Sequence, residues 1–529
     1  MIRPGKPSIL VAAVFVFAAI ASSARAQAPA RSCASLTSLQ IARTSITSSE
    51  PVAAKPKPAK PPTGPAYAMD LVDVALPSYC LADGEIDKHA GPNGKSYGIQ
   101  FALALPDKWN GRFLFQGGGG MDGSVRPPLG AQAAGKEPAL ARGFAVVSMD
   151  SGHEGGIFDM SFNRDQLASL DFAYIALGKV TTVAKEVIAQ YYGEPAKHSY
   201  FVGCSTGGRQ AMLASQRYPT QFDGVVAGDP AMRTGYSRIA DAWNAAQFNQ
   251  AAPKNAQGQP IPGEAFSESD KKLLTDSILD ACDGKDGLKD GMIFNFEACH
   301  YNPDVLQCSG AKTDACLSSA QVTALRKVFA GPRDSQGIDP YVGRPYDAGV
   351  AIYMPGTFGS VLPRSGPSMF GRPNTAMTVD VDALERQAAG DPVEALTDTT
   401  WTNLTSFAAH GGKLIFFHGL SDPVFSPYDT LRYYNEMAKA NGGADEVRNW
   451  SRIFLVPGMN HCGGGPALDK FDALGAVVKW VEQGEAPNSI IATGKYFPGE
   501  SRPLCAYPKH AQYKGSGDPK DASSFVCAD

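Results

Sequence analysis

The pentapeptide Gly203-Cys204-Ser205-Thr206-Gly207 constrains the fold of this chain more than any other segment. It is a G-x-S-x-G pattern that follows an apolar run and opens a stretch with helical spacing. A tight strand-to-helix turn needs small flanking residues if it is to hold a serine in a strained, exposed position. Taken alone the pattern also fits an ordinary glycine-rich turn, but the strand before it and the helix after it favour a nucleophile elbow.

Short apolar runs alternate with helix-like stretches through much of the chain, which predicts the α/β class. The predicted strands cover residues 112–115, 144–148, 200–203, 225–227, 413–418 and 452–456, and the predicted helices cover 170–191 and 208–217. The alternation stops between residues 234 and 401, where Gly, Pro and Ser are frequent. We therefore expect a sheet domain, 67–233 and 402–529, interrupted by an inserted lid, 234–401.

The N-terminus has the pattern of a secretory signal peptide spanning residues 1–26. Arg3 and Lys6 precede an apolar run at 8–20, and Ala24-Arg25-Ala26 offers a cleavage site. A retained membrane anchor is the alternative, but the run is short for a membrane span. We expect a secreted or periplasmic protein that has no membrane attachment after cleavage. Residues 27–66, rich in Pro, Lys and Ala from 51 to 65, predict an N-terminal strap or linker.

The ten cysteines suit an oxidising compartment and five disulfides. Local spacing suggests Cys282–Cys299, Cys308–Cys316 and Cys505–Cys527, which leaves Cys33–Cys80 and Cys204–Cys462, although spacing alone does not fix the pairing. The net charge of −4, with acids and bases nearly balanced, supplies no electrostatic case for binding nucleic acid. No obligate protein partner is evident.

Asp422 is the candidate acid of a catalytic triad. In α/β-hydrolases the order along the chain is nucleophile, acid, base. Asp422 comes after Ser205 and follows the predicted strand at 413–418, whereas Asp445, Asp469 and Asp472 have no strand that delivers them to the same sheet edge. A turn aspartate ahead of a proline is the alternative interpretation of Asp422.

His461 is the candidate base, because it comes after Asp422 and follows the predicted strand at 452–456. His418 precedes Asp422, against the expected order, and is interpreted as a strand-end packing residue. His153 follows a glycine-flanked turn and could line the site, and His510 lies in the C-terminal tail. Cys204 and Cys462 adjoin the nucleophile and the base, so a bond between them would tie the two loops together.

These residues predict a two-step acyl transfer. His461 takes the Ser205 proton as the serine attacks an ester carbonyl, and Asp422 orients the imidazole. The backbone N–H of Thr206 and one from the glycine run at 117–120, for which we favour Gly120, would bind the oxyanion. A flexible surface loop is the alternative for that run.

The arrangement Cys204-Ser205, Asp422 and His461-Cys462 resembles the tannase and feruloyl esterase family. The resemblance covers nearly all of the mature chain, and its further segments lie at 109–113, 200–209, 456–462 and 513–518. It implies an α/β-hydrolase core with a large inserted lid domain, the triad above and a Cys204–Cys462 disulfide. It also implies a structural Ca²⁺ site in the lid, formed by Asp283, Asp286 and Asp290 with the backbone carbonyls of Leu288 and Met292. Closely spaced carboxylates suit a hard cation, although the spacing is not that of an EF-hand.

The resemblance leaves the substrate open among small-molecule esters of ferulate, gallate and terephthalate. Phe425 matches a substrate-binding phenylalanine of the terephthalate type, and Arg364 is a candidate for its carboxylate-binding arginine, although a solvated surface arginine is the alternative. Thr206 matches the feruloyl-esterase form of the elbow, where the terephthalate type has an acidic residue. We expect a secreted serine carboxylesterase of feruloyl-esterase type, with mono(2-hydroxyethyl) terephthalate as a further substrate. The alternatives are a tannase acting on gallate esters, a serine peptidase of related fold and a non-catalytic binding protein.

Overall fold

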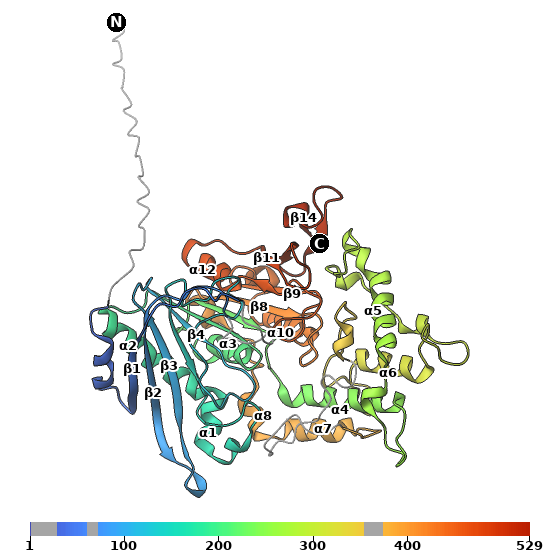
Figure 1. Ribbon diagram of the computed structural model, residues 1–529, viewed down its shortest axis with the longest axis horizontal. Helices are drawn as coiled ribbons and strands as arrows, with labels where there is room; N and C mark the ends of the chain where they lie inside the picture. Colours follow the sequence, from blue (N-terminus) through green and yellow to red (C-terminus); the bar gives the residue numbers. More distant parts are fainter. Residues whose placement is uncertain (2–28, 61–71, 354–373) are drawn as a thin grey trace.

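A twisted sheet of nine strands forms the centre of the computed structural model, which describes residues 29–60, 72–353 and 374–529 (Figure 1). The strand order across the sheet is β1-β2-β3-β5-β4-β6-β7-β8-β9. In chain order the strands are β1 (Thr44–Val52), β2 (Tyr79–Ala90), β3 (Ser96–Pro106), β4 (Arg112–Gln116), β5 (Ala145–Met149), β6 (His198–Cys204), β7 (Gly224–Gly228), β8 (Lys413–Gly419) and β9 (Ser451–Val456).

Six neighbouring strands, in the spatial order β5-β4-β6-β7-β8-β9, run parallel and form the buried part of the sheet. Their sequences are continuous apolar runs because helices cover both faces of a parallel sheet. Alternate side chains of β4 accordingly enter two different cores, with Phe113 and Phe115 in one and Leu114 in the other. All six of these strands match apolar runs that the sequence predicted, and the α/β class is confirmed.

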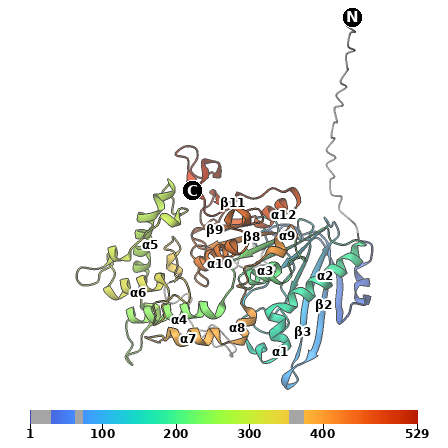
Figure 2. The same ribbon diagram turned by 180° about the vertical axis from the view of Figure 1, so that it is seen from behind.

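Helices pack on both faces of this sheet (Figures 1 and 2). The first core contains side chains of α2, α3 and α10, and the second contains those of α12. The helices of this domain are α1 (Gln166–Leu170), α2 (Ala176–Tyr192), α3 (Thr206–Arg217), α9 (Thr405–Ala409), α10 (Pro427–Ala440), α11 (Ala444–Val447) and α12 (Ala473–Gln483). Smaller sheets follow near the C-terminus, formed by β10 (Lys470–Phe471), β11 (Ser489–Thr493), β12 (Ser501–Cys505), β13 (His510–Tyr513) and β14 (Phe525–Ala528).

The lid leaves the sheet after β7 and returns at β8, and these two strands are hydrogen-bonded neighbours. It stands beside the sheet domain as a mostly helical body (Figure 1). Its helices are α4 (Thr234–Ala251), α5 (Glu268–Cys282), α6 (Ser319–Ala330), α7 (Val381–Ala389) and α8 (Pro392–Thr397).

The antiparallel strands β1, β2 and β3 were not predicted from the sequence. β1 lies within residues 27–66, so part of the expected strap is an edge strand of the main sheet, paired with β2. Pro51 is tolerated in β1 because an edge strand leaves one row of backbone groups without a ladder partner. β1 is largely exposed, which removes the apolar signal of a buried strand.

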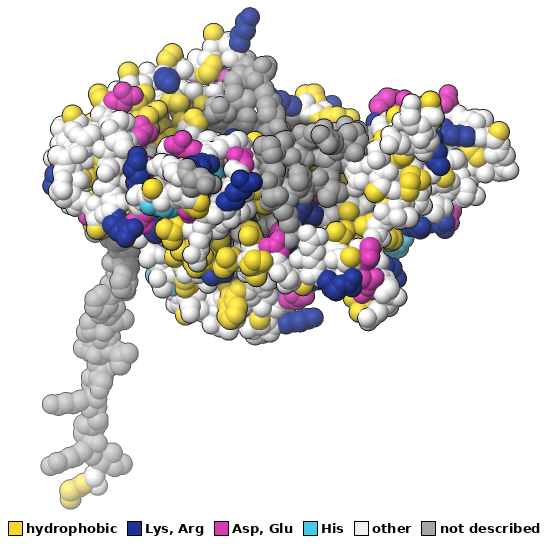
Figure 3. Space-filling view, turned by 90° about the horizontal axis from the view of Figure 1, so that it is seen from below, with side chains coloured by type: hydrophobic (Ala, Val, Ile, Leu, Met, Phe, Trp, Pro, Cys, Tyr) yellow, Lys and Arg dark blue, Asp and Glu magenta, His cyan; other side chains and the backbone are white. Residues whose placement is uncertain are grey.

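One helical stretch, Gln166–Tyr192, is long and apolar enough to span a membrane by composition alone, but over half of its most apolar window is buried inside the protein, where it contributes to the first core. The predicted signal peptide and Arg364 lie outside the described residues. On the face shown in Figure 3, acidic and basic side chains are intermingled, in keeping with the small net charge.

Candidate active site

The carboxyl ends of the parallel strands bring the predicted triad residues to one edge of the sheet. Ser205 directly follows β6, Asp422 lies three residues beyond β8, and His461 lies five residues beyond β9. Ligand sites of open α/β sheets form at this edge, because the strand-to-helix loops gather there.

Ser205 occupies a strained turn between β6 and α3. Its φ and ψ are 64° and −123°, a backbone conformation that side-chain-bearing residues rarely adopt. The flanking glycines are sterically required: a Cβ on Gly203 would lie 2.4 Å from the Gly207 carbonyl oxygen, and one on Gly207 would lie 2.8 Å from that of Gly118. The pentapeptide therefore forms the elbow that the sequence pattern predicted.

Asp422 and His461 are joined directly. The Nδ1 atom of His461 lies 2.8 Å from Oδ2 of Asp422, whose side chain is fully buried. Burial lowers the pKa of His461, but the charge of Asp422 outweighs burial and raises it above its ordinary value. Burial raises the pKa of Asp422, and the two nearby histidines, His461 and His418, outweigh that effect and lower it. Ser205 and His461 each have a cysteine as a neighbour in the sequence. Within the described structure no hydrogen bond joins their two side chains.

The structure forms all five disulfides that cysteine spacing suggested, including Cys204–Cys462. The Cα atoms of Cys204 and Cys462 lie 5.9 Å apart, and this bond ties the loop of His461 to the turn of Ser205. The carboxylate of Asp229 lies beneath this bond and accepts hydrogen bonds from the backbone N–H groups of Cys462 and Gly419. The loops after β7, β8 and β9 are thus linked at one buried point.

His418 lies behind the acid, not on the surface of the site. Its Nε2 atom is 3.2 Å from Oδ2 of Asp422 and 3.5 Å from Oδ1 of Asp229, and all three side chains are fully buried. Burial lowers the pKa of His418, but the two carboxylates raise it overall. The packing role expected from sequence therefore understates this residue, because His418 places a basic group between two buried acids.

The glycine run after β4 is ordered by a buried polar network. The side chain of Gln210 accepts from Gly118 N–H and donates to Asp122, which in turn accepts from Gly119 N–H. Burial raises the pKa of Asp122. Gly120 has a φ of +62°, and its carbonyl accepts from the Thr206 hydroxyl. Among the described residues, the N–H groups of Gly120 and Thr206 have no acceptor, which leaves both able to bind an oxyanion.

Phe425 lies beside the base, with its ring edge-on to His461 at a centroid distance of 5.4 Å. This position suits contact with an aromatic acyl group next to the reacting atoms.

The rival acids have other partners. Asp472 caps α12, Asp445 pairs with Arg448, and Asp469 accepts from the Gly464 N–H.

His153 is buried against Phe162, with ring centroids 3.8 Å apart, and burial lowers its pKa to about 4. Its ring nitrogens have no hydrogen-bond partner in the described structure. His510 lies in β13. Neither histidine is hydrogen-bonded to Asp422.

The predicted calcium loop lies inside the Cys282–Cys299 disulfide. Asp283 accepts from the Asp290 and Gly291 N–H groups, Asp286 accepts from Phe294 N–H, and Asp290 pairs with Arg502. Burial, with repulsion from the other two carboxylates, raises the pKa of Asp286 to about 7. This donor set fits a hard cation, since each carboxylate would be stabilised by positive charge.

The three lid carboxylates do not converge as closely as two other groups in the described part of the chain. Two groups of three possible ligands converge within 4.8 Å, and both contain Asp229. One includes the sulfurs of the Cys204–Cys462 disulfide, which are not thiolates, and the other includes His418 and Asp422 of the site above.

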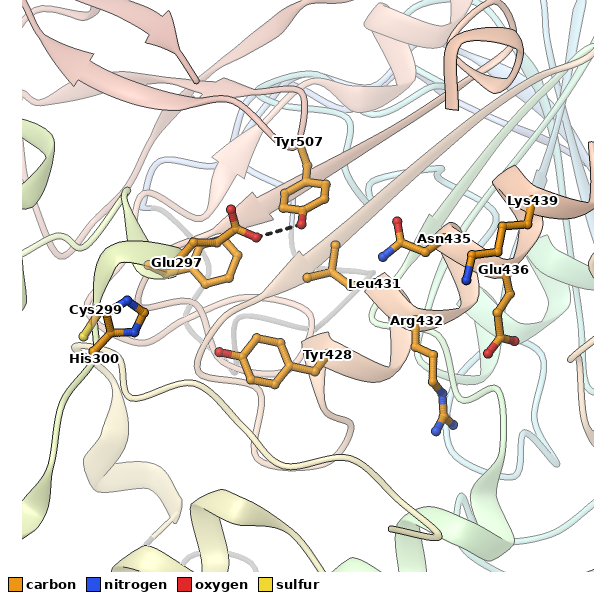
Figure 4. A pocket seen from close by; sticks show the side chains of 11 residues that line it. Glu297, Cys299, His300, Tyr428, Leu431, Arg432, Asn435, Glu436, Lys439 and Tyr507 are labelled. Carbon is orange, nitrogen blue, oxygen red and sulfur yellow. Dashed lines mark hydrogen bonds between the residues drawn. The ribbon is translucent and has the colours of Figure 1, made fainter. Parts of the chain in front are cut away.

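A cavity of about 620 Å³ lies between the lid and the sheet domain (Figure 4). Tyr507 donates a hydrogen bond to Glu297 across it. Its lining comes from the lid, α10 and the C-terminal region: Phe296, Glu297, Cys299, His300, Tyr428, Leu431, Arg432, Asn435, Glu436, Lys439 and Tyr507. The triad residues do not line this cavity.

Sequence reasoning missed Asp229 and the lid residues that touch the site. Asp229 directly follows β7, so the strand-end argument that selected Asp422 could have found it. Arg344, whose guanidinium donates to the backbone carbonyl oxygens of Asp422 and Val424, had no such signal, because its contact is made only in the folded lid.

Comparison with known proteins identifies the family of this chain. Residues 84–360 and 372–528 match the family described as tannase and feruloyl esterase. Mono(2-hydroxyethyl) terephthalate hydrolase of Piscinibacter sakaiensis is 38% identical over 517 residues, which cover 86% of this chain and 85% of that protein. A probable feruloyl esterase of Arthroderma benhamiae is 30% identical, with 94% and 93% covered.

Among solved structures, feruloyl esterase B from Aspergillus oryzae aligns with a TM-score of 0.74 at 25% identity, covering 94% of this chain and 100% of that one. Tannin acyl hydrolase from Aspergillus niger aligns with a TM-score of 0.69 at 20% identity, which shows the shared fold. This chain is a carboxylic ester hydrolase that belongs to the tannase and feruloyl esterase family.

Proposed function

We propose that this enzyme hydrolyses esters of aromatic acids through an acyl-enzyme on Ser205, with His461 as general base and Asp422 as its orienting acid. The observation that carries the proposal is the 2.8 Å contact between His461 and Asp422, next to the disulfide that ties His461 to the Ser205 turn. A serine hydroxyl becomes an effective nucleophile only when a positioned base takes its proton.

In the proposed reaction Ser205 Oγ attacks the ester carbonyl while Nε2 of His461 accepts its proton. The tetrahedral intermediate expels the alcohol, which takes that proton, and the acyl-enzyme remains. Water then attacks the acyl-enzyme, again with His461 as base, and releases the acid and Ser205. The buried carboxylate of Asp422 keeps the His461 proton on Nδ1 and stabilises the imidazolium.

The oxyanion in both steps would be bound by the free N–H groups of Gly120 and Thr206. Support comes from the hydrogen bond that the Thr206 hydroxyl donates to the Gly120 carbonyl, because this bond restrains the backbone at Gly120. The Gln210 and Asp122 network restrains the preceding glycines in the same way. Donors that are already oriented need no reorganisation when charge develops, which is why such sites lower the barrier strongly.

For the substrate we propose an ester with an aromatic acyl group, of feruloyl type, with mono(2-hydroxyethyl) terephthalate as a further candidate. Phe425, edge-on to His461, supports an aromatic acyl group. The named activities of the relatives concern ferulate, tannin and terephthalate esters. Specificity constants on methyl ferulate, methyl gallate and mono(2-hydroxyethyl) terephthalate would rank these acyl groups. Preference for the gallate ester would favour a tannase instead.

The test of the triad is labelling by a fluorophosphonate probe, combined with hydrolysis of methyl ferulate. Ser205→Ala should abolish both, whereas Ser215→Ala, at the far end of α3, should leave both intact. A Ser205→Ala enzyme that still turns over ester would contradict the proposed nucleophile.

We also propose that the lid loop binds a structural Ca²⁺ ion through Asp283, Asp286 and Asp290, with the Leu288 and Met292 carbonyls. The support is the set of clustered carboxylates, of which Asp286 has a pKa raised to about 7. When bound, the ion would neutralise this repulsion and stiffen the loop. Removal of Ca²⁺ by EDTA should lower the Tm before kcat changes, and Ca²⁺ should restore it; a Tm that does not respond to either would argue against the site.

Export is proposed from the predicted signal peptide together with the five disulfides, which persist only in an oxidising compartment. Mass spectrometry of the mature protein should find an N-terminus at Gln27. An intact Met1 in the exported fraction would contradict cleavage at Ala26.

A further inference from the structure

The lid touches the site through one continuous segment, residues 341–353, which we call the lid clamp. It contacts two loops of the sheet domain: the acid loop, residues 419–426, and the base loop, residues 457–462. A lid segment whose only function was to cover the substrate would line the substrate-binding space. The lid clamp instead contacts the backbone that carries Asp422 and His461.

The acid loop receives most of these contacts. Tyr353 OH donates to the Leu420 carbonyl, and the Arg344 guanidinium donates to the Asp422 carbonyl. Ser426 N–H donates to the Tyr341 hydroxyl, and the Ser426 hydroxyl donates to the carbonyl of Gly343. The loop of the acid is therefore held on both sides of Asp422 by a segment that lies some 70–85 residues earlier in the chain.

Asp347 joins the two loops. Its Oδ2 atom accepts from Ser421 Oγ at 2.6 Å, in the acid loop, and from Gly458 N–H at 2.7 Å, in the base loop. Gly349 N–H, two residues on, donates to the same Ser421 hydroxyl at 3.0 Å. Asp347 itself is fully buried.

The environment of Asp347 is costly for a carboxylate. Its Oδ1 atom has no hydrogen-bond partner among the described residues. A desolvated carboxylate without a partner for one oxygen destabilises a fold, and burial raises the pKa of Asp347. A neutral amide would accept the same two hydrogen bonds without the cost of burying a charge, whereas an apolar side chain would leave the Ser421 hydroxyl and the Gly458 N–H unpaired. The two loops already share a direct bond, from Ser421 N–H to the Met459 carbonyl, so the chain does not need Asp347 to bring them together.

We propose that Asp347 is a positioning residue of the lid, which sets the spacing between the acid loop and the base loop and so the alignment of Asp422 with His461. The inference rests on the proposed triad. It makes the lid a part of the catalytic machinery as well as a cover, because the geometry of the base depends on a side chain that the lid supplies. A misplacement of about 1 Å in such an arrangement can cost about 100-fold in rate.

The experiment compares Asp347→Ala, Asp347→Asn and Ser421→Ala with the wild-type enzyme. Both bonds use one oxygen of Asp347, so the carbonyl oxygen of an asparagine can accept both, whereas alanine can accept neither. We expect Asp347→Ala to lose at least about tenfold in kcat, and in the rate of fluorophosphonate inactivation, with KM within about threefold. Asp347→Asn should retain kcat within about threefold to fivefold, since neutral hydrogen bonds are weaker than charge-assisted ones.

The matched control is Asp276→Ala, which removes an exposed lid carboxylate paired with Lys272 on the same helix, and it should leave kcat unchanged. In a double-mutant cycle, Asp347→Ala and Ser421→Ala should be less than additive in kcat, because they break the same bond. A merely structural role for Asp347 would lower Tm, in Asp347→Ala more than in Asp347→Asn, and would leave kcat unchanged well below the Tm.

The proposal is overturned if Asp347→Ala keeps kcat within twofold, if only KM changes, or if asparagine is as damaging as alanine. Should Asp347→Ala fail to fold, Ser421→Ala decides: a fewfold loss of kcat supports the proposal and an unchanged kcat refutes it. Ser205→Ala separates the two inferences. Activity in Ser205→Ala would refute the triad, while an inactive Ser205→Ala together with a fully active Asp347→Ala would refute only the positioning role.

Discussion

Removal of the Cys204–Cys462 disulfide should weaken catalysis more than substrate binding. The bond connects residues that directly precede Ser205 and directly follow His461, so no flexible spacer separates it from the reacting groups. The informative variant is Cys204→Ala with Cys462→Ala. Serine is unsuitable, because the Cys204 Sγ atom lies 3.2 Å from Asp229, and a hydroxyl there could donate to that carboxylate and partly restore the link.

The magnitude has two parts. The bond closes a loop with a sequence separation of 258, for which the chain-entropy model gives a stabilisation of about 5.5 kcal/mol. Engineered and natural bonds commonly deliver about 2–4 kcal/mol, so we expect a clear fall in Tm. In addition, Ser205 and His461 lose their shared restraint, and kcat should fall by about 10- to 100-fold while KM changes by less than about threefold.

A second disulfide supplies the control. Cys505–Cys527 has a sequence separation of 22 and joins β12 to β14, and the same model gives it about 3 kcal/mol. Its double alanine variant should lower Tm but leave kcat unchanged when both enzymes are assayed well below their Tm. Equal losses of kcat in the two variants would show that general destabilisation, not triad geometry, is responsible, and an unchanged kcat without Cys204–Cys462 would refute the reasoning outright.

Three further predictions concern the same site. The pKa of His461 is raised because the charge of Asp422 outweighs burial. We therefore expect kcat/KM to fall as the pH is lowered, with a midpoint above pH 6.5, and a midpoint below pH 6.5 would contradict this. The same raised pKa stabilises the fold at low pH and stops doing so as pH rises through it. Gly203→Ala should lose at least about 100-fold in activity, since its Cβ would lie 2.4 Å from a backbone oxygen, whereas Gly263→Ala, with open space around it, should be silent in the same assay. Gln210→Ala should lower kcat about tenfold at constant KM by releasing the glycine run; a rise in KM alone would point to substrate contact instead.

The parallel strands could be predicted because they are buried on both faces and therefore leave continuous apolar runs. β2 and β3, the longest strands of the sheet, were missed. β3 has the same signal as the parallel strands, since its residues 101–106 form a buried apolar run, but β2 does not. β2 contains acidic and basic residues on its more exposed side, and its apolar residues are spread through the alternation of an antiparallel strand. The signal was present as period-two patterning, but it was weaker than that of the short buried strands.

The residues of the proposed triad could be selected as candidates because each follows a recognisable strand, and the Cys residues beside Ser205 and His461 marked the two loops. Asp229 carried the same strand-end signal, since it directly follows β7, and it was missed although the strand itself was predicted. Asp347 had no local signal at all. Its proposed function, the alignment of the two loops, comes from contacts with Ser421 and Gly458 more than 70 residues away, which no spacing rule can supply.

The point of insertion explains why the lid reaches the acid and the base so directly. The lid leaves after β7, at the sheet edge where Asp229 and Asp422 emerge, and the chain re-enters the sheet at the opposite edge, because β7 and β8 are parallel. A segment from its interior needs only to fold back across this opening to contact the acid loop and, beyond it, the base loop. An insertion elsewhere in the sheet could cover the substrate, but it could not hold Asp422 from one side while Asp229 holds the base loop from the other. In this family member the lid and the triad should therefore be exchanged or engineered as one unit, and a lid transplanted without the residues that pair with Asp347 should fold and yet turn over slowly.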